Sequence, residues 1–476
     1  MDENMKVGIL AVGAYIPYYY MERAAIGKAW GERGGKGRRS ICNSDEDSLT
    51  MSVEAVRDCL YGLDKGKIDN LFSATTTSAY QEKSGATLIA TASCLRSDIL
   101  SVDFNSSVRS GAAALKLAFD SAATGAETIV VAADKRVGAP KSGEEKMFGD
   151  AAAAALVGQG DVIAECVAVA NVDDEIHDYW RNDNDRTVNT TEARFMMEKG
   201  YEAAMPKAIK AAMSQAGLSG GQINKLALST PDLKAHIQIA KKGGVPEDRI
   251  QDPLMMEVGN CGCAHMLLIL ASALETARPG DMIVAAQYGS GATAFIFRVT
   301  ERINDYRNPV VTKYMNRRAE FTDYARFLSF NGLVTPKQGE PFKIPAAPSI
   351  TWREQNTYLR LEAGTCTKCG CKTFPADRVC YNCRSKDSMT VESRTEAKST
   401  LFSFSIDRLA GRSDDPLIVQ AIGNDDQNIR FYMNMTDVNE SEIGIGMELE
   451  FTFRRIHNLA NLPNYYWKYR PVRFKR

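Results

Sequence analysis

The sequence contains no uncharged apolar run that reaches the ~18 residues needed for a membrane-spanning helix. It also has almost no net charge, because 58 lysines and arginines are matched by 59 aspartates and glutamates. We therefore expect no membrane anchor and no nucleic acid as a partner. The opening residues, MDENMKVGIL, lack the pattern of a secretory signal peptide, so we expect a cytoplasmic protein.

The eleven cysteines are too unevenly spaced for a disulfide framework. Six are scattered between Cys42 and Cys263, and the other five lie between Cys366 and Cys383. A secreted disulfide scaffold is short and evenly rich in cysteine. One dense cluster in a chain of 476 residues instead indicates reduced thiols that bind a metal.

Four of the clustered cysteines form two C-x-x-C pairs. The pair Cys366 and Cys369 precedes the pair Cys380 and Cys383 by ten intervening residues. Paired knuckles of this kind place four thiolates around a tetrahedral Zn²⁺. Because the protein fills all four positions, we expect a structural zinc rather than a catalytic one. Cys371 is surplus to this set.

The pattern of the chain changes near residue 345. Before it, strand-like and helix-like segments alternate in two successive halves, which predicts an α/β sandwich with an internal duplication. After the cysteine cluster, short alternating runs such as STLFSFSI and MELEFTFRRI are separated by turns, which predicts a small barrel of the OB type. The expected regions are 1–170 and 171–345 for the two halves, 346–392 for the zinc ribbon and 393–476 for the barrel.

The stretch DFNSSVRSGAAALKLAF, residues 103–119, predicts a strand, a small-residue turn and a helix. Acyl-transfer enzymes hold their nucleophile at such a turn, because a helix N-terminus lowers the pKa of a thiol. Here the turn offers Ser106, Ser107, Val108 and Arg109 but no cysteine.

Many motifs in this sequence resemble those of archaeal-type hydroxymethylglutaryl-CoA synthases, which are members of the thiolase superfamily. They include VGILAVGAYIPYYYMERAAIGKAWG near the start, HDYWR at 177–181, AKKGGVPEDRI, LASALETARPGD and YGSGA at 288–292. The resemblance covers about residues 6–330, and the ribbon and barrel resemble the zinc-ribbon/OB protein that accompanies such enzymes. It implies a five-layered α/β/α/β/α fold, a dimer and an acyl-CoA substrate.

The resemblance also implies a cysteine that carries the acyl group, a histidine and a glutamate. In this sequence the cysteine falls on Val108, the histidine on Ser229 of STPDLK and the glutamate on Thr76 of TTTSAY. Valine cannot form a thioester, so a covalent acyl-enzyme at this position is excluded. The asparagine of the family is kept as Asn260.

The expected pocket retains groups that stabilise negative charge. Asn260 can donate to a carbonyl oxygen, and the YGSGA turn can supply backbone N–H groups for an oxyanion hole through Gly289 and Gly291. Arg109 either binds a substrate carboxylate or CoA phosphate, or forms a structural salt bridge. The predicted substrate-binding residues are Arg109, Ser229, Gly289, Ser290 and Gly291.

The stretch GNCGCAHM places Cys261, Cys263 and His265 close to Asn260. One interpretation is a relocated thiol–imidazole pair that provides acid–base or nucleophilic catalysis. The other is that small cysteines pack beneath the start of a helix.

Three functions are therefore open. The first is aldol or retro-aldol chemistry on an acyl-CoA, which needs no acylated cysteine. The second is a catalytically silent subunit that organises a hetero-oligomer around an active thiolase-like partner. The third is acyl transfer with Cys261 or Cys263 as a displaced nucleophile.

Overall fold

The computed structural model describes residues 6–306, 308–337, 345–409 and 411–474. These residues form two compact units. The first unit comprises the chain up to Cys42, Asp47–Ala90 and Leu95–Phe327. The second comprises Asn43–Glu46, Thr91–Cys94 and the described chain from Leu328 onward.

The first unit is built on a nine-stranded mixed sheet with the order β11-β12-β13-β8-β1-β7-β6-β4-β5. Its strands are β1 (Val7–Tyr15), β4 (Ile68–Ala74), β5 (Leu100–Phe104), β6 (Glu127–Asp134), β7 (Ala151–Gln159), β8 (Ala164–Asp173), β11 (Lys225–Leu228), β12 (Met282–Tyr288) and β13 (Gly291–Val299). Each of them falls on a segment whose apolar pattern favours a strand.

The sheet consists of two halves with the same strand order, which confirms the predicted duplication. The first half runs β5-β4-β6-β7-β1, and the second runs β11-β12-β13-β8. In the second half, a single parallel bridge between Leu226 and Ile250 stands where the first half has β5. Antiparallel pairs between β1 and β8, Gly8 with Glu165 and Ile9 with Ala164, join the two halves.

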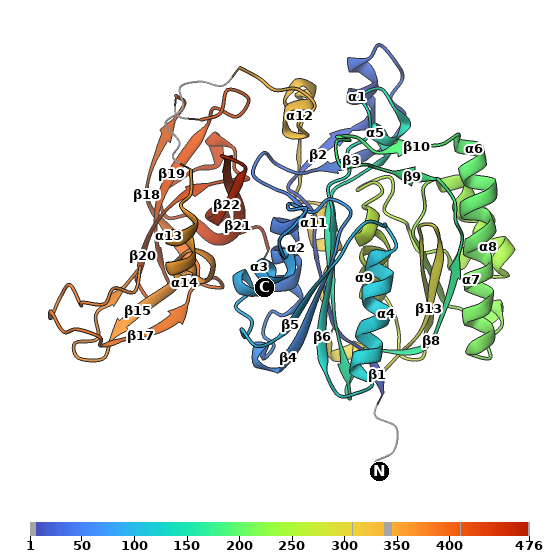
Figure 1. The fold of residues 1–476 in the computed structure, drawn as a ribbon, viewed down its shortest axis with the longest axis horizontal. Helices are drawn as coiled ribbons and strands as arrows, with labels where there is room; N and C mark the ends of the chain where they lie inside the picture. The colour runs from blue at the N-terminus through green and yellow to red at the C-terminus, as the bar shows by residue number, and fades with distance from the viewer. Residues whose placement is uncertain (1–5, 307, 338–344, 410, 475–476) are drawn as a thin grey trace. The chain divides into compact units, whose positions relative to one another are not determined.

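Helices cover both halves and also separate them, which gives the expected five layers (Figure 1). Helix α2 (Ser48–Cys59) packs on the first half, and α7 (Glu202–Gln215) with α8 (Leu233–Gly243) covers the second. Helices α4 (Ser110–Ala122) and α9 (His265–Glu275) contact each other between the halves. Phe119 of α4, for example, lies against Phe295 and Phe297 of β13.

Shorter elements complete the first unit. They are β2 (Tyr19–Glu22), α1 (Arg23–Ala29), β3 (Arg38–Ile41), η1 (Lys65–Lys67), α3 (Gly85–Ala92), α5 (Gly143–Met147), β9 (Tyr179–Trp180), β10 (Asn189–Thr190), α6 (Ala193–Phe195), the π-helix η2 (Met196–Tyr201), η3 (Gly220–Gln222), η4 (Glu247–Arg249), η5 (Gly262–Ala264), α10 (Ile303–Tyr306), α11 (Thr312–Met315), β14 (Ala319–Glu320) and α12 (Tyr324–Phe330). The last of them extends into the second unit.

The second unit contains a small three-stranded sheet and a closed five-stranded barrel. The sheet has the order β16-β15-β17, and the barrel closes as β18-β19-β20-β22-β21. Only β20 and β22 pair in parallel, at Met435 and Tyr469, and the other barrel pairs are antiparallel. This closed arrangement of five strands confirms the predicted OB-type barrel.

The elements of the second unit are α13 (Pro348–Arg353), α14 (Gln355–Arg360), β15 (Glu362–Cys366), β16 (Lys372–Thr373), β17 (Met389–Ser393), β18 (Lys398–Asp407), β19 (Ile418–Asp425), β20 (Arg430–Met435), η6 (Glu440–Glu442), β21 (Glu448–Leu459) and β22 (Leu462–Pro471). Aromatic side chains fill the barrel, among them the buried Phe431, Phe451, Phe453 and Trp467. The expected region boundary near residue 345 adjoins residues 338–344, which lie outside the described residues.

Among the helices of the described residues, none has both the length and the apolar character needed to cross a bilayer.

The tight approach of α4 to η5 predicts that Gly111 is required for stability. A β-carbon on Gly111 would lie 2.5 Å from the carbonyl oxygen of Cys263. We expect Gly111→Val to lower the free energy of unfolding by roughly 1–3 kcal/mol, because the backbone of one element must move. Urea denaturation followed by circular dichroism measures this loss. Ala113→Val, on the exposed side of the same helix, is the control, and an equal loss in both variants would contradict the prediction.

Candidate functional site

The structure brings the turn at Val108 into contact with the YGSGA turn. A β-carbon on Gly289 would lie 2.7 Å from Cγ2 of Val108 and 3.0 Å from the backbone nitrogen of Arg109. Only glycine therefore fits at position 289 without displacing the helix start. Val108 is half-buried and immediately precedes Arg109, the N-cap of α4. Two segments that are 180 residues apart in the sequence thus form one wall of the candidate site.

Backbone N–H groups in this wall differ in their availability. The N–H of Gly289 donates to the carbonyl oxygen of Gly291 at 3.0 Å and is therefore engaged. The N–H groups of Val108 and Ser290 have no hydrogen-bond partner among the described residues. Ser290 has a φ of 43°, in the left-handed region, as the tight turn between β12 and β13 requires. Val108 and Ser290, rather than Gly289, are the candidates for anion-stabilising donors.

Asp134, at the end of β6, is a buried carboxylate that the sequence analysis missed. Its Oδ1 accepts hydrogen bonds from the hydroxyls of Thr75 and Thr77, at 3.0 and 3.1 Å, and from the N–H of Thr76 at 2.7 Å. Its Oδ2 accepts from the N–H of Cys263 at 2.8 Å. One side chain therefore fixes the turn after β4 and the start of η5. A carboxylate that ends an otherwise apolar strand, as in ETIVVAAD, is the signal that could have identified it.

Asn260 is half-buried and oriented by two hydrogen bonds. Its Nδ2 donates to the carbonyl of Thr230 at 3.1 Å, and its Oδ1 accepts from the N–H of Gly262 at 3.0 Å. Because the amide nitrogen carries two hydrogens, one N–H of Asn260 is left to donate to a bound molecule.

Ser229 connects the end of β11 to its neighbours. Its hydroxyl accepts from the N–H of Tyr288 at 3.0 Å, and its carbonyl accepts from the hydroxyl of Tyr201 at 2.9 Å. The residue is buried and sits directly beside the YGSGA turn. These contacts give Ser229 a role in holding that turn.

Cys261, Cys263 and His265 are all buried beneath the start of α9. The Cys261 thiol donates to the carbonyl of Gly259 at 3.4 Å, whereas its backbone N–H donates to Nδ1 of His265 at 3.0 Å. The Cys263 thiol donates to the carbonyl of Ser107 at 3.2 Å. Neither thiol bonds to the imidazole, so the geometry agrees with the packing interpretation.

The pKa values of Cys261, Cys263 and His265 also argue against a reactive thiol–imidazole pair. Burial, reinforced by nearby carboxylates, raises the pKa of both Cys261 and Cys263 well above the usual range. Burial lowers the pKa of His265 to about 3. At neutral pH the thiols and the imidazole are therefore all uncharged.

Arg109 is engaged in a structural contact. Its guanidinium donates to the carbonyl of Val172 at 2.9 Å and pairs with the carboxylate of Asp173 at 2.5 Å. Both partners lie at the end of β8. Of the two interpretations of this arginine, the salt bridge is the one that the structure contains.

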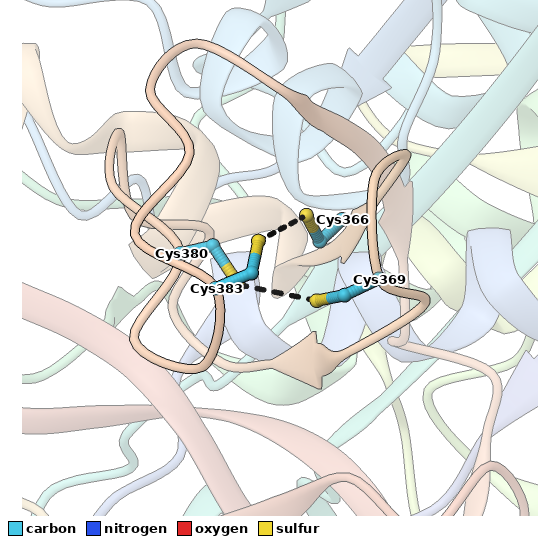
Figure 2. Close-up of side chains that lie close together, drawn as sticks. All are labelled: Cys366, Cys369, Cys380 and Cys383. Carbon is cyan, nitrogen blue, oxygen red and sulfur yellow. Dashed lines mark hydrogen bonds between the residues drawn. The ribbon is translucent and has the colours of Figure 1, made fainter.

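Four cysteines of the second unit, Cys366, Cys369, Cys380 and Cys383, converge (Figure 2). All four Sγ atoms lie within 4.8 Å of one another, with 3.7 Å between Cys366 and Cys383 and 3.6 Å between Cys369 and Cys380. Tetrahedral zinc with Zn–S bonds of about 2.3 Å separates its sulfurs by about 3.8 Å. The cluster therefore has the ligand set and size for zinc. Cys371 is not among the four.

The two knuckles share one backbone conformation. Each ends in a residue with left-handed φ, Gly370 at 73° and Arg384 at 64°. The N–H of each donates to the carbonyl of the first cysteine in its knuckle, Cys366 or Cys380, at 2.8 and 2.9 Å. Both C-x-x-C pairs therefore adopt the same turn.

The chain is similar to hydroxymethylglutaryl-CoA synthases and to 3-oxoacyl-[acyl-carrier-protein] synthases III. A family model described as 3-oxoacyl-[acyl-carrier-protein (ACP)] synthase III C terminal matches residues 213–299. The hydroxymethylglutaryl-CoA synthase of Methanosphaera stadtmanae is 28% identical over 342 residues, which cover 69% of this chain and 99% of that protein. The synthase of Pyrococcus furiosus is 29% identical over 339 residues, with coverages of 69% and 96%.

Solved structures support the same fold. An HMG-CoA synthase crystallised with CoA superposes with a TM-score of 0.61 at 20% identity, covering 67% of this chain and 88% of that one. The 3-oxoacyl-[acyl-carrier-protein] synthase III of Aquifex aeolicus gives a TM-score of 0.55 at 18% identity, covering 61% and 99%. The chain has the thiolase-type fold of these enzymes. Over about 69% of its length it is similar to archaeal HMG-CoA synthases, and its four-cysteine cluster and barrel follow.

Burial and raised pKa values predict that the two thiols beneath the start of α9 are unreactive. At pH 8 we expect iodoacetamide to label Cys261 and Cys263 at least roughly tenfold more slowly than the half-buried Cys371, because so little thiolate is present. Peptide mapping by mass spectrometry measures each rate. In Val108→Cys we expect an additional thiol that labels faster than Cys263. Rapid labelling of Cys263 in the folded protein would instead support a displaced nucleophile.

Proposed function

We propose that this chain binds an acyl-CoA in the site beside Val108 and acts on a carbon–carbon bond by an aldol or retro-aldol route. The observation that carries this proposal is the valine at the nucleophile turn, where two backbone N–H groups have no hydrogen-bond partner among the described residues. Such donors stabilise an enolate or oxyanion whether or not a nucleophile is present.

The retro-aldol direction illustrates the chemistry. The 3-hydroxyl of a 3-hydroxyacyl-CoA gives its proton to solvent water and becomes a carbonyl as the C2–C3 bond breaks. The bonding electron pair moves to C2 and the thioester carbonyl, which form an enolate, and C2 then takes up a proton. In this proposal Val108 and Ser290 donate backbone N–H groups to the enolate oxygen, and Asn260 donates its remaining amide N–H. No covalent bond to the protein forms.

A silent subunit is the second candidate, and the environment of Asp134 favours it. This carboxylate already accepts four hydrogen bonds, so it positions its neighbours and has little capacity left as a base. Thr76 and Ser229 stand where the resemblance implies a glutamate and a histidine. In this candidate function the chain binds acyl-CoA, as a homodimer or in a hetero-oligomer, while an active thiolase-like partner performs the chemistry.

The third candidate, acyl transfer through a displaced cysteine, has less support. The protonated, buried state of Cys261 and Cys263 opposes nucleophilic attack by either sulfur. The four-cysteine cluster is proposed to hold a structural Zn²⁺, since its four thiolates leave no open coordination position.

Turnover by the purified chain distinguishes these functions. We expect 3-hydroxyacyl-CoAs to release an aldehyde or ketone without added CoA, measured by mass spectrometry. Val108→Cys should retain this activity within roughly threefold, because the mechanism needs only the backbone N–H at position 108. Binding without turnover would favour the silent subunit. Cleavage that requires free CoA and leaves an acylated cysteine would contradict the aldol proposal.

Metal analysis tests the zinc proposal separately. We expect inductively coupled plasma mass spectrometry to find near-stoichiometric zinc in the purified chain. Cys380→Ser should lose most of it, since removing one thiolate from a closed site weakens binding strongly. Cys371→Ser is the matched control and should keep its zinc. A full zinc content in Cys380→Ser would show that the cluster is not the binding site.

A further inference from the structure

Arg136 is a buried cation without a hydrogen-bonding or ionic partner among the described residues. Only 4% of its surface is exposed. Its guanidinium carbon lies 4.1 Å from the ring centroid of Phe148 and 5.0 Å from that of Tyr179. These cation–π contacts bind its flat surface and leave the N–H groups around its edge unused.

The position of Arg136 places it within the candidate site. It follows the buried Asp134 by two residues, and a β-carbon on Gly262 would lie 2.8 Å from its Cδ. Phe148, on which it stacks, forms a parallel bridge with Asn260. The arginine therefore lies beside the asparagine that is proposed to contact the reacting carbonyl.

Two other charged groups nearby, Asp134 and Arg181, are already engaged. Asp134 accepts four hydrogen bonds from Thr75, Thr76, Thr77 and Cys263, and it makes no ion pair with Arg136 within 4.0 Å. Arg181 donates to the carbonyl of Thr76 at 2.5 Å. Of these charged side chains, Arg136 is the one whose N–H groups have no hydrogen-bond partner among the described residues.

An unpaired buried charge is costly, so a feature of this kind requires an explanation. Some side-chain nitrogens and oxygens of the described residues have neither solvent contact nor a hydrogen-bond partner. The nitrogens of Arg136 do not belong to this group, so they retain some contact with solvent. Its guanidinium edge therefore opens onto accessible space. A carboxylate that enters this space would gain charge-assisted, forked hydrogen bonds.

We infer that Arg136 binds a free carboxylate on the acyl group, so that the chain selects CoA thioesters of dicarboxylic acids. This inference rests on the proposed acyl-CoA site. A phosphate of CoA fits the same donors, but Arg136 lies beside Asn260 and Cys263, where the acyl group and not the nucleotide is expected.

Binding of matched thioesters tests the inference. The probes are malonyl-, succinyl- and glutaryl-CoA, each with its methyl monoester, and free CoA, measured by isothermal titration calorimetry on the full chain. For at least one pair we expect the free acid to bind roughly 10- to 100-fold more tightly than the ester. In Arg136→Gln this preference should fall to within about twofold, and Arg136→Lys should restore part of it.

Two controls separate the inference from the proposed function. Arg430→Gln removes an exposed arginine that lies 4.1 Å from the Phe402 ring in the second unit, and it should leave every affinity unchanged. Free CoA should bind equally well to the unmodified chain and to Arg136→Gln. Loss of CoA affinity in Arg136→Gln, or equal binding of acid and ester by the unmodified chain, would overturn the inference alone. Failure of the unmodified chain to bind CoA and every thioester would overturn the proposed function as well.

Discussion

The carboxylate of Asp134 is the constraint on which the candidate site depends. It is completely buried, and its two oxygens accept hydrogen bonds from the turn after β4 and from the backbone at the start of η5. Because an ionised carboxylate is stable in the interior only when it is hydrogen-bonded, these segments must meet around it. Gly262 lies against the same side chain, where a β-carbon would come within 2.1 Å of Oδ2. The position of Asn260, two residues earlier, follows from this packing.

Much of the fold could be predicted from the sequence because its signals are local. The apolar runs of β6, β7 and β12 and the helical spacing of α2 and α7 each lie within one short segment of the sequence. The four-cysteine cluster is also local, since the spacing of two knuckles nearly determines their geometry. The alternation of strand-like and helix-like segments predicted the duplication, and the matching strand orders of the two halves confirm it.

The candidate site was harder to predict, because its properties arise from contacts between distant segments. Sequence reasoning selected Gly289 as a donor, but the hydrogen bond within its own turn engages that N–H and leaves Ser290 available. The sequence also left two interpretations of Arg109, and only the proximity of Asp173 distinguishes them. Asp134 and Arg136 were missed for the same reason. The segment ETIVVAADKR does not show that Asp134 accepts four hydrogen bonds, or that Arg136 has no hydrogen-bonding or ionic partner in the part of the chain that the structure describes.

These features together change what the site can do. At the three positions where the resemblance implies reactive groups, the chain has valine, threonine and serine, none of which is ionised at neutral pH. The thiols next to the site are held protonated by burial, so they do not replace the missing nucleophile. What remains is a set of fixed donors, from backbone N–H groups to the Arg136 guanidinium, beside one anion whose hydrogen bonds are already made. Such a site gains most from a ligand that brings its own negative charge, either as a carboxylate or as an enolate formed during reaction.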